Sequence, residues 1–272
     1  MTIKQKILHT IQNTLSKSRI ITLLAVKIRN QCNRIIIQRF ATNSMSPHIN
    51  GEYLVINHIA PFCNSFFDVG ANKGEWTAHI LNNTSAFYLY EPGTIAFNMC
   101  ATRFKSHQNV SLNNFALSDN KGKIEFYEQD NAGEMSSALE KWANGPCKII
   151  EVDTTTIDAE LSRLKIDLLS FVKIDTEGFD LKVLKGATQA IINNKIGFIQ
   201  FEYNQSWLLL GATLAEAYEL LESNGYAIFL IKADGLYTYD LTIFDEFYAF
   251  SNFMAIAPQH MPHVQPIIKG AA

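Results

Sequence analysis

The chain has 272 residues, of which 47% are hydrophobic and 18% are charged. This composition excludes wholesale disorder, and the length allows one sizeable core with an extension, or two small domains. The formal net charge of -3 is unevenly distributed, because residues 1–51 hold eight of the 23 bases and none of the 26 acids. The rest of the chain therefore has a net charge of -11, which makes it a poor partner for nucleic acid.

The chain begins with a basic stretch, and we expect residues 1–49 to form a helical arm. Its first apolar residues recur at helical spacing from Ile3 to Leu15. The denser run Ile20–Val26 is far shorter than the ~20 residues that cross a bilayer. Lys27–Arg29 follows it, where a signal peptide would have small residues. These features predict a cytoplasmic protein that is neither secreted nor membrane-spanning.

Two roles are compatible with a basic amphipathic arm. It can pack as a cap on the domain or on a second subunit of a homo-oligomer. Alternatively, residues 1–40 can lie on the anionic inner face of a membrane. The sequence leaves both roles open.

Four cysteines are spread through the chain and form no CxxC pair: Cys32, Cys63, Cys100 and Cys147. In a chain of this size they predict reduced thiols in a cytoplasmic protein, and neither a disulfide framework nor a zinc site.

From residue 50 onward, short apolar runs alternate with helical patterns such as Leu181–Ile192 and Leu214–Asn224. Such alternation predicts an α/β domain over residues 50–258, with a mostly parallel sheet and helices on both faces. The apolar runs are Ser65–Val69, Ala86–Tyr90, Val110–Leu117, Leu168–Ile174, Ile196–Phe201, Tyr226–Ile231 and Phe253–Ile256.

Two segments break this rhythm. In the first, Lys123–Glu128 alternates like an edge strand and Gln129–Gly145 is polar, so we expect an insertion over residues 123–153 that hangs over the ligand face. The second, residues 259–272, contains two prolines and two histidines and ends in small residues. It predicts a loose C-terminal tail, in which His260 and His263 are not metal ligands.

The segment Phe66–Thr77 (FFDVGANKGEWT) predicts a buried strand, a glycine turn and the start of a helix. Gly70 and Gly74 give a GxxxG spacing, which matches neither the P-loop nor the GxGxxG dinucleotide motif. Asp68 precedes the turn and would repel a pyrophosphate. A carboxylate there suits a ligand with an ammonium group, such as the methionine part of S-adenosylmethionine.

Glu91 ends the next predicted strand, about 20 residues beyond the turn. A carboxylate at this place commonly accepts hydrogen bonds from both ribose hydroxyls of an adenosine. Together with Asp68, it favours an adenosine-containing cofactor that is not a dinucleotide.

A second group of charged residues ends an otherwise apolar strand at Phe171–Gly178 (FVKIDTEG). Lys173 and Asp175 share one face of that strand, and Glu202 ends a later apolar strand. If the two strands are neighbours, these three side chains converge beside the cofactor's methyl group. Asp175, Glu177 or Glu202 can then act as a base or hold a divalent cation, or the group is a structural ion-pair network.

These motifs together resemble the FkbM family of methyltransferases over roughly residues 50–257. The resemblance is carried by FDVGANKGEWT, YEPG, NNFALSDNKG, VKIDTEGFDLKVLKGA and, more weakly, QFEYN. The segment Asp175–Gly178 followed by Leu184–Ala187 is its most distinctive part. Asp180 stands where many relatives carry Glu, and the basic arm lies outside the resemblance.

The resemblance implies a class I methyltransferase domain, with a Rossmann-like, seven-stranded sheet and S-adenosylmethionine as the methyl donor. It also implies O-methylation of a sugar, a glycan precursor or another small hydroxylated metabolite. The implied cofactor contacts are Asp68, Gly70, Asn72 and Gly74 at the methionine side, Glu91 at the ribose, and Asn114, Ala116 and Ser118 at the adenine. Asp175 and Glu177 are implied to lie at the acceptor side, with Lys173 and Glu202 as the further candidates from strand periodicity.

Two other functions are carried as alternatives. One is a non-catalytic S-adenosylmethionine-binding module, against which the intact Asp175–Gly178 segment argues. The other is a nicotinamide-dependent oxidoreductase, which the missing GxGxxG motif disfavours. No residue pattern names the methyl acceptor.

Overall fold

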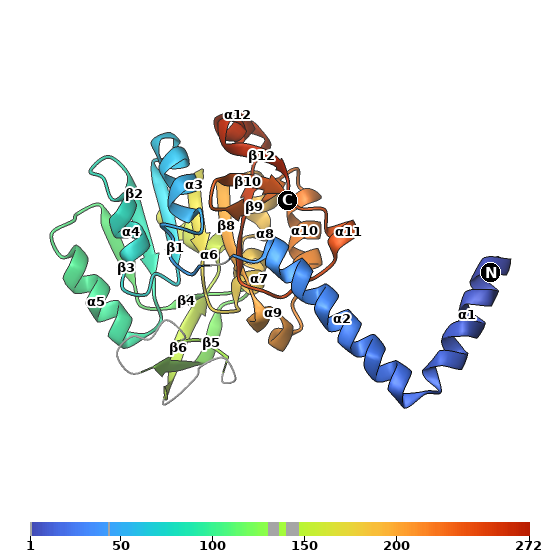
Figure 1. The fold of residues 1–272 in the computed structure, drawn as a ribbon. Coiled ribbons are helices and arrows are strands. Elements are labelled where there is room, and N and C mark those ends of the chain that lie inside the picture. The colour runs from blue at the N-terminus through green and yellow to red at the C-terminus, as the bar shows by residue number, and fades with distance from the viewer. Residues whose placement is uncertain (1, 43, 130–135, 140–146) are drawn as a thin grey trace. The chain divides into compact units, whose positions relative to one another are not determined.

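The computed structural model describes residues 2–42, 44–129, 136–139 and 147–272 (Figure 1). The chain divides into two compact units, Met1–Ala41 and Thr42–Ala272.

The first unit consists of two helices, in agreement with its apolar spacing. α1 (Ile3–Ser16) begins with a capping box, in which the Thr2 hydroxyl accepts a hydrogen bond from the Gln5 N–H and the Gln5 side chain accepts one from the Thr2 N–H. α2 (Arg19–Phe40) begins after Ser18, whose hydroxyl accepts a hydrogen bond from the Ile21 N–H. None of the helices that the structure describes is long and apolar enough to cross a membrane.

The second unit is built on a nine-stranded sheet in the order β12-β10-β9-β11-β8-β7-β1-β2-β3. Strands β3, β2, β1, β7 and β8 are parallel, whereas β11 runs antiparallel to both β8 and β9. The strands are β1 (Ser65–Val69), β2 (Ala86–Tyr90), β3 (Val110–Asn113), β7 (Leu169–Ile174), β8 (Ile196–Tyr203), β9 (Ala227–Lys232), β10 (Gly235–Thr238), β11 (Ser251–Ile256) and β12 (Ile268–Ala271). The predicted mostly parallel α/β sheet is confirmed, but β10 and β12 extend it from seven strands to nine.

Helices cover both faces of this sheet (Figure 1). On one face, α3 (Glu52–Ile59), α4 (Glu75–Ile80), α5 (Thr94–Phe104) and α12 (Met261–Val264) bury their apolar side chains against strand residues such as Phe66 and Phe171. The other face is covered by α6 (Ile157–Leu164), α7 (Asp180–Lys185), α8 (Thr188–Ile192) and α10 (Leu214–Glu222). Two short helices, α9 (Gln205–Leu210) and α11 (Leu241–Phe244), complete the unit.

Two predicted elements are divided in the structure. The run Val110–Leu117 forms β3 and the separate β4 (Ala116–Leu117), because the Asn114 amide binds the backbone oxygens of Glu91 and Pro92 and turns the chain. The helical pattern Leu181–Ile192 is divided into α7 and α8 beside Gly186. A Cβ at Gly186 would lie 2.0 Å from the Ser118 backbone oxygen.

The expected insertion contains a hairpin. β5 (Gly122–Gln129) pairs antiparallel with β6 (Cys147–Thr155), and β4 adds to β6 to make a three-stranded sheet. The predicted edge strand at Lys123–Glu128 therefore lies within β5. Most of the polar segment Gln129–Gly145 falls outside the described residues.

The prediction of a loose tail over residues 259–272 is wrong. The segment forms α12 and β12 with short 3-10 turns, and β12 pairs with β10. Val264 is fully buried and Ile267 nearly so, because the prolines and histidines separate apolar residues that reach the core. The ring of His260 packs against Phe198, with 5.0 Å between the ring centroids.

The turn after β1 brings three chain segments unusually close. Gly70 has a φ of +81°, and its N–H donates to the Tyr90 backbone oxygen at 2.9 Å. A Cβ at this position would lie only 1.9 Å from the Asp175 backbone oxygen. Glycine is required here both for its backbone angle and for the missing side chain.

A pair of glycine substitutions separates these two requirements. Gly211 also has a positive φ, of +67°, but nothing lies within 4 Å of a Cβ there. We expect Gly211→Ala to lower the free energy of unfolding by about 1 kcal/mol, and Gly70→Ala to lower it by about 3 kcal/mol or more, because backbone must also move. Urea denaturation measures the free energy of unfolding of both variants. Equal losses would show that the close approach of Gly70 to the Asp175 backbone adds no cost.

Candidate active site

The carboxyl ends of β1, β2, β7 and β8 meet at a cavity of about 260 Å³. This is the predicted crevice, since ligands of open α/β sheets bind at this edge. Phe126 and Glu128 of β5 form one wall, and Glu52 and Tyr53 of α3 lie in another. The cavity is therefore enclosed by the sheet, by the insertion and by the segment that precedes the sheet.

The glycine turn borders the cavity, but Asp68 lies beneath it. Asp68 is 1% exposed, and one of its oxygens accepts a hydrogen bond from the Thr77 hydroxyl at 2.7 Å. Burial raises the pKa of Asp68, although the nearby Lys173 opposes this shift. Asp68 thus connects the end of β1 to α4. It is not among the described residues that line the cavity.

Asn72 is the most unusual residue of the turn. Its φ is +48°, a left-handed conformation that asparagine tolerates better than most residues. Its backbone N–H donates to the Glu91 carboxylate at 2.8 Å, and its backbone oxygen accepts a hydrogen bond from the Cys100 thiol. The buried Asn72 side-chain oxygen has no hydrogen-bond partner among the described residues. The turn is thus held against β2 and α5 while it borders the cavity.

Glu91 follows β2 directly and lines the cavity. Its two carboxylate oxygens accept backbone hydrogen bonds from Asn72 and from Gly93, at 2.8 and 2.7 Å. Burial raises the pKa of Glu91 to about 7, against the effect of these two hydrogen bonds. Each oxygen keeps a further lone pair that can accept a hydrogen bond from a ligand hydroxyl.

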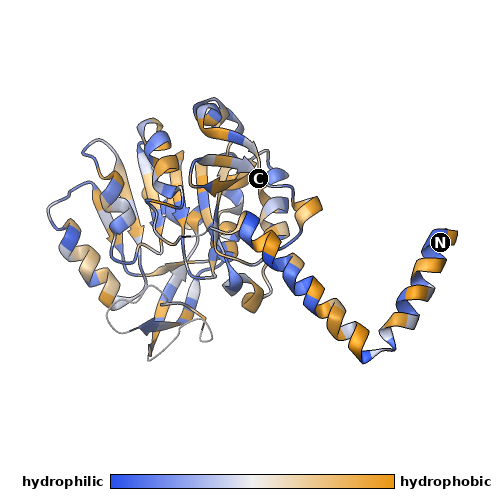
Figure 2. Ribbon diagram, in the orientation of Figure 1, coloured by the Kyte–Doolittle hydropathy of each residue, from blue (hydrophilic) through white to orange (hydrophobic). Residues whose placement is uncertain are grey.

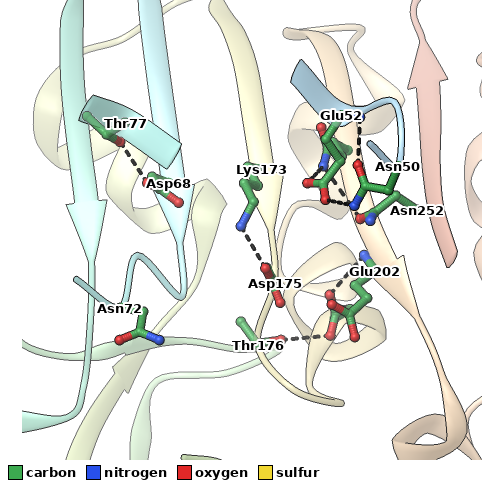
Figure 3. Close-up of polar contacts among 12 residues, drawn as sticks. Asn50, Glu52, Asp68, Asn72, Thr77, Lys173, Asp175, Thr176, Glu202 and Asn252 are labelled. Atoms are coloured by element: carbon green, nitrogen blue, oxygen red, sulfur yellow. Dashed lines mark hydrogen bonds and ion pairs between the residues drawn. The ribbon is translucent and has the colours of Figure 1, made fainter. Parts of the chain in front are cut away.

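A buried ion pair lies at the centre of the site (Figure 3). Lys173 Nζ lies 2.7 Å from Asp175 Oδ2, and only 8% of the lysine side chain is exposed. Burial alone would lower the pKa of Lys173, but the carboxylates of Asp175, Asp68 and Glu52 raise it above its usual value. In turn, burial would raise the pKa of Asp175, but Lys173 holds it below its usual value. The pair is therefore ionised.

Glu202, at the end of β8, completes the group that strand periodicity predicts. The strands β7 and β8 are neighbours, and the Asp175 and Glu202 carboxyl groups share a hydrogen bond. Burial, with the negative charges of Asp175, Glu177 and Asp180, raises the pKa of Glu202 far above its usual value. The Asn204 amide also donates to Glu202. The raised pKa favours the protonated form of Glu202, which can donate a hydrogen bond to Asp175.

The Asp-Thr-Glu-Gly turn after β7 is fixed by Asp180. One Asp180 oxygen accepts hydrogen bonds from the Thr176 hydroxyl and the Gly178 N–H, and the other accepts one from the Glu202 N–H. Glu177 has a left-handed φ of +52°, and its backbone oxygen accepts a hydrogen bond from Ser137. These contacts hold Glu177 at the cavity wall.

Glu52 is a site residue that the sequence analysis missed. It is 7% exposed, in the first turn of α3, and its oxygens accept hydrogen bonds from the amides of Asn50 and Gln200 at 2.6 and 2.7 Å (Figure 3). Burial raises the pKa of Glu52, and Lys173 opposes the shift. The only sequence signal was that Glu52 is the first acid of the chain.

Only some of the remaining predicted cofactor contacts line the cavity. Ala116 lines the cavity. Gly74, Asn114 and Ser118 are absent from the described residues that line it. Gly74 instead packs against Phe104 and Cys100. Ser118 is buried, and its hydroxyl donates a hydrogen bond to the Asp119 carboxylate. These three residues shape the turns around the cavity.

No group of three or more His, Cys, Asp or Glu side chains that could hold a metal ion is found among the described residues.

The strand order, with β11 antiparallel beside β8, and the cavity at the carboxyl ends define a class I methyltransferase fold. Residues 68–228 match the family described as "Methyltransferase FkbM domain", and the chain belongs to this family. A search of curated proteins found no match.

Several solved structures are similar in fold at low sequence identity. One is the fibrillarin pre-rRNA processing protein of Methanococcus jannaschii, with 11% identity, 78% of this chain and 76% of that chain covered, and a TM-score of 0.43. Another is a putative methyltransferase from Streptococcus mutans in complex with SAH, with 9% identity, 76% and 97% covered, and a TM-score of 0.44. A third is precorrin-6y C5,15-methyltransferase from Geobacter metallireducens, with 12% identity, 72% and 80% covered, and a TM-score of 0.39.

The hydrogen bond between Thr77 and Asp68 gives a stability prediction. Thr77→Val keeps the side-chain shape but removes the hydroxyl donor to a buried carboxyl group, so we expect it to lower the free energy of unfolding by about 1–3 kcal/mol. Thr102→Val is the matched control, since Thr102 is an exposed helical threonine whose hydroxyl binds the Asn98 oxygen. Its effect should stay within about 0.5 kcal/mol. Equal effects in urea denaturation would show that the bond to Asp68 is unimportant.

Proposed function

We propose that this chain is an S-adenosylmethionine-dependent methyltransferase that methylates a hydroxyl group of a sugar, a glycan or another small metabolite. One observation carries the proposal. The Glu91 carboxylate and the hydrogen-bonded Asp175–Glu202 pair line a single cavity. A group suited to ribose and a group suited to an acceptor hydroxyl therefore border the same space.

The cofactor end of the cavity fits S-adenosylmethionine. Glu91 offers free lone pairs to the ribose hydroxyls, and Gly70 and Ala71 of the turn line the same cavity. Ala116 and Leu117 offer apolar surface for the adenine ring of the cofactor. When bound, the cofactor supplies a methyl group on a positively charged sulfur.

The charge of the lining selects among acceptors. Among the described residues, seven acids and the two lysines Lys73 and Lys173 line the cavity. Burial raises the pKa of three of these acids, Glu52, Glu91 and Glu202, and the other four are Glu75, Glu128, Asp175 and Glu177. A negative cavity attracts a sulfonium ion and disfavours an anionic acceptor. We therefore expect the methylated part of the acceptor to be a neutral, hydroxyl-bearing group.

Asp175 is suited to handle the proton of such a hydroxyl. Lys173 keeps the Asp175 carboxylate ionised, and the neighbouring Glu202, whose pKa is raised by burial, can donate a hydrogen bond to it. The acceptor hydroxyl would donate to Asp175, which would orient the oxygen and take the proton as the methyl group passes from sulfur to that oxygen. Lys173 and Glu202 act here as positioning residues.

We infer that the acceptor is recognised by those cavity-lining residues that lie outside the range matched by the family. Met45, Pro47, Glu52, Tyr53 and Phe250 line the cavity but lie outside residues 68–228. The Tyr53 ring is held by stacking on His79, with 3.6 Å between the ring centroids. We assign choice of acceptor to this wall.

The assignment of Glu91 predicts how cofactor binding depends on pH. The ribose hydroxyls donate to the ionised carboxylate, so a Glu91 pKa of about 7 should make S-adenosylhomocysteine bind up to about tenfold more tightly at pH 8 than at pH 6. Glu91→Gln should remove this dependence and weaken binding at pH 8 by about 10–100-fold.

Calorimetry tests this, with Glu128→Gln as the control because Glu128 is a second buried carboxylate of the same cavity. The control should change the affinity far less. Unchanged affinity in Glu91→Gln would refute the ribose assignment. Tight binding of NAD without binding of S-adenosylhomocysteine would refute the proposed function.

The assignment of Asp175 predicts a loss of turnover. Asp175→Asn should still bind S-adenosylhomocysteine, but it should lower methyl transfer by about 10²–10⁴-fold because the hydroxyl loses its proton acceptor. The assay follows radiolabelled methyl groups from S-adenosylmethionine into a panel of free and lipid-linked sugars. The product should carry a methyl ether that survives alkaline hydrolysis.

Glu177→Gln is the comparison variant, since Glu177 lines the same cavity. A larger loss in Glu177→Gln than in Asp175→Asn would move the base to Glu177. Full activity of Asp175→Asn would remove Asp175 as the base.

A further inference from the structure

The N-terminal unit carries a charge of one sign. Its two helices and their flanks contain eight bases and no acid: Lys4, Lys6, Lys17, Arg19, Lys27, Arg29, Arg34 and Arg39. The rest of the chain, in contrast, has 26 acids against 15 bases. A unit of this charge is attracted to a dense negative surface.

The helix α1 presents apolar residues on one side. Ile3, Ile7, Leu8, Ile11 and Leu15 recur at helical spacing and are between 44 and 79% exposed, and no described residue of α1 is buried. At 100° per residue these five side chains fall within less than half of the helix circumference. Lys6 and Lys17 lie on the other side of the helix, whereas Lys4 lies on the apolar side, near the N-terminus.

The first half of α2 is more densely apolar, and its apolar residues spread over more than half of the helix circumference. Six large apolar residues, Ile20, Ile21, Leu23, Leu24, Val26 and Ile28, are exposed there. Arg19, Lys27 and Arg29 flank or interrupt this run. Figure 2 shows apolar residues recurring along both helices of the unit.

From these observations we propose that residues 2–40 bind the surface of an anionic lipid bilayer, with the apolar side of α1 and the start of α2 in the headgroup region. Apolar side chains on one side with lysine and arginine around them are what interfacial helices use. The bases add attraction to anionic headgroups. Neither helix is long and apolar enough to cross the bilayer, so the described part of the unit would lie on it.

Charge argues against a second copy of the same unit as the partner. Two such units would bring together bases only, since residues 1–51 contain no acid to pair with them. Coiled-coil partners are commonly selected by pairs of opposite charges beside the apolar seam. A lipid surface satisfies both the apolar side and the charge.

Vesicle flotation of the full chain tests the proposal. Vesicles of phosphatidylcholine alone are compared with vesicles of equal parts phosphatidylcholine and phosphatidylglycerol. The first variant, Ile7→Asp with Ile11→Asp, places two acids on the apolar side. The control, His9→Asp with Asn13→Asp, places two acids at the same spacing on the opposite side, where these two side chains contact each other.

We expect the unaltered chain to float with the mixed vesicles and much less with phosphatidylcholine alone. The Ile7→Asp/Ile11→Asp variant should lower the partition into mixed vesicles at least about tenfold, and the control should lower it by much less. High salt should weaken binding. Circular dichroism and melting temperature verify that both variants fold alike.

Three outcomes would overturn the proposal. One is failure of the unaltered chain to float with the mixed vesicles. The second is an equal loss in both variants, which would mean that only charge matters and no apolar side chain enters the bilayer. The third is a stable dimer in sedimentation experiments without lipid that Ile7→Asp/Ile11→Asp dissociates, because the apolar side would then belong to a second copy. None of these outcomes depends on the methyl acceptor or on the cofactor.

Discussion

The buried ion pair between Lys173 and Asp175 is the interaction on which the site depends. A lysine that is only 8% exposed on its side chain has lost most of its hydration, a cost that only nearby negative charge offsets. Asp175 makes the largest contribution, and Asp68 and Glu52 contribute from β1 and α3. One cation therefore joins three separate chain segments at the carboxyl edge of the sheet.

Because Lys173 is paired with Asp175, the protonation states of the neighbouring acids differ. Asp175 is ionised beside Lys173, whereas the pKa values of Glu202 and Glu52 are raised mainly by burial. The cavity wall therefore combines a hydrogen-bond acceptor at Asp175 with Glu202, whose raised pKa favours the protonated form that can donate. A hydroxyl group, which both donates and accepts, is matched to such a wall, and a phosphate is not.

The parts of the site that follow from the sequence are those fixed by local pattern. The strands Ser65–Val69 and Ala86–Tyr90 have the predicted bounds, because each is a mainly apolar run that a turn signal follows, Gly70 in the first case and Pro92-Gly93 in the second. The convergence of Lys173, Asp175 and Glu202 follows from the period of a strand once β7 and β8 are adjacent. Family resemblance added the class of fold.

The rest depends on contacts between distant segments. Glu52 is held in the site by a hydrogen bond from Gln200, which lies 148 residues further along the chain. No local sequence pattern predicts that contact. Asp68 faces Thr77 and Lys173 rather than the cavity, because the turn after β1 folds above it. In the same way, β12 is fixed by pairing with β10, a partner that residues 259–272 do not reveal by themselves.

A crystal structure of the chain with S-adenosylhomocysteine tests the central claim most directly, namely that the cofactor and the acceptor meet at the Lys173–Asp175 pair. The account predicts the ribose hydroxyls on Glu91 and the sulfur on the side of the cavity that Asp175 and Glu202 line. A ligand bound elsewhere, or a sulfur directed away from Asp175, would contradict it.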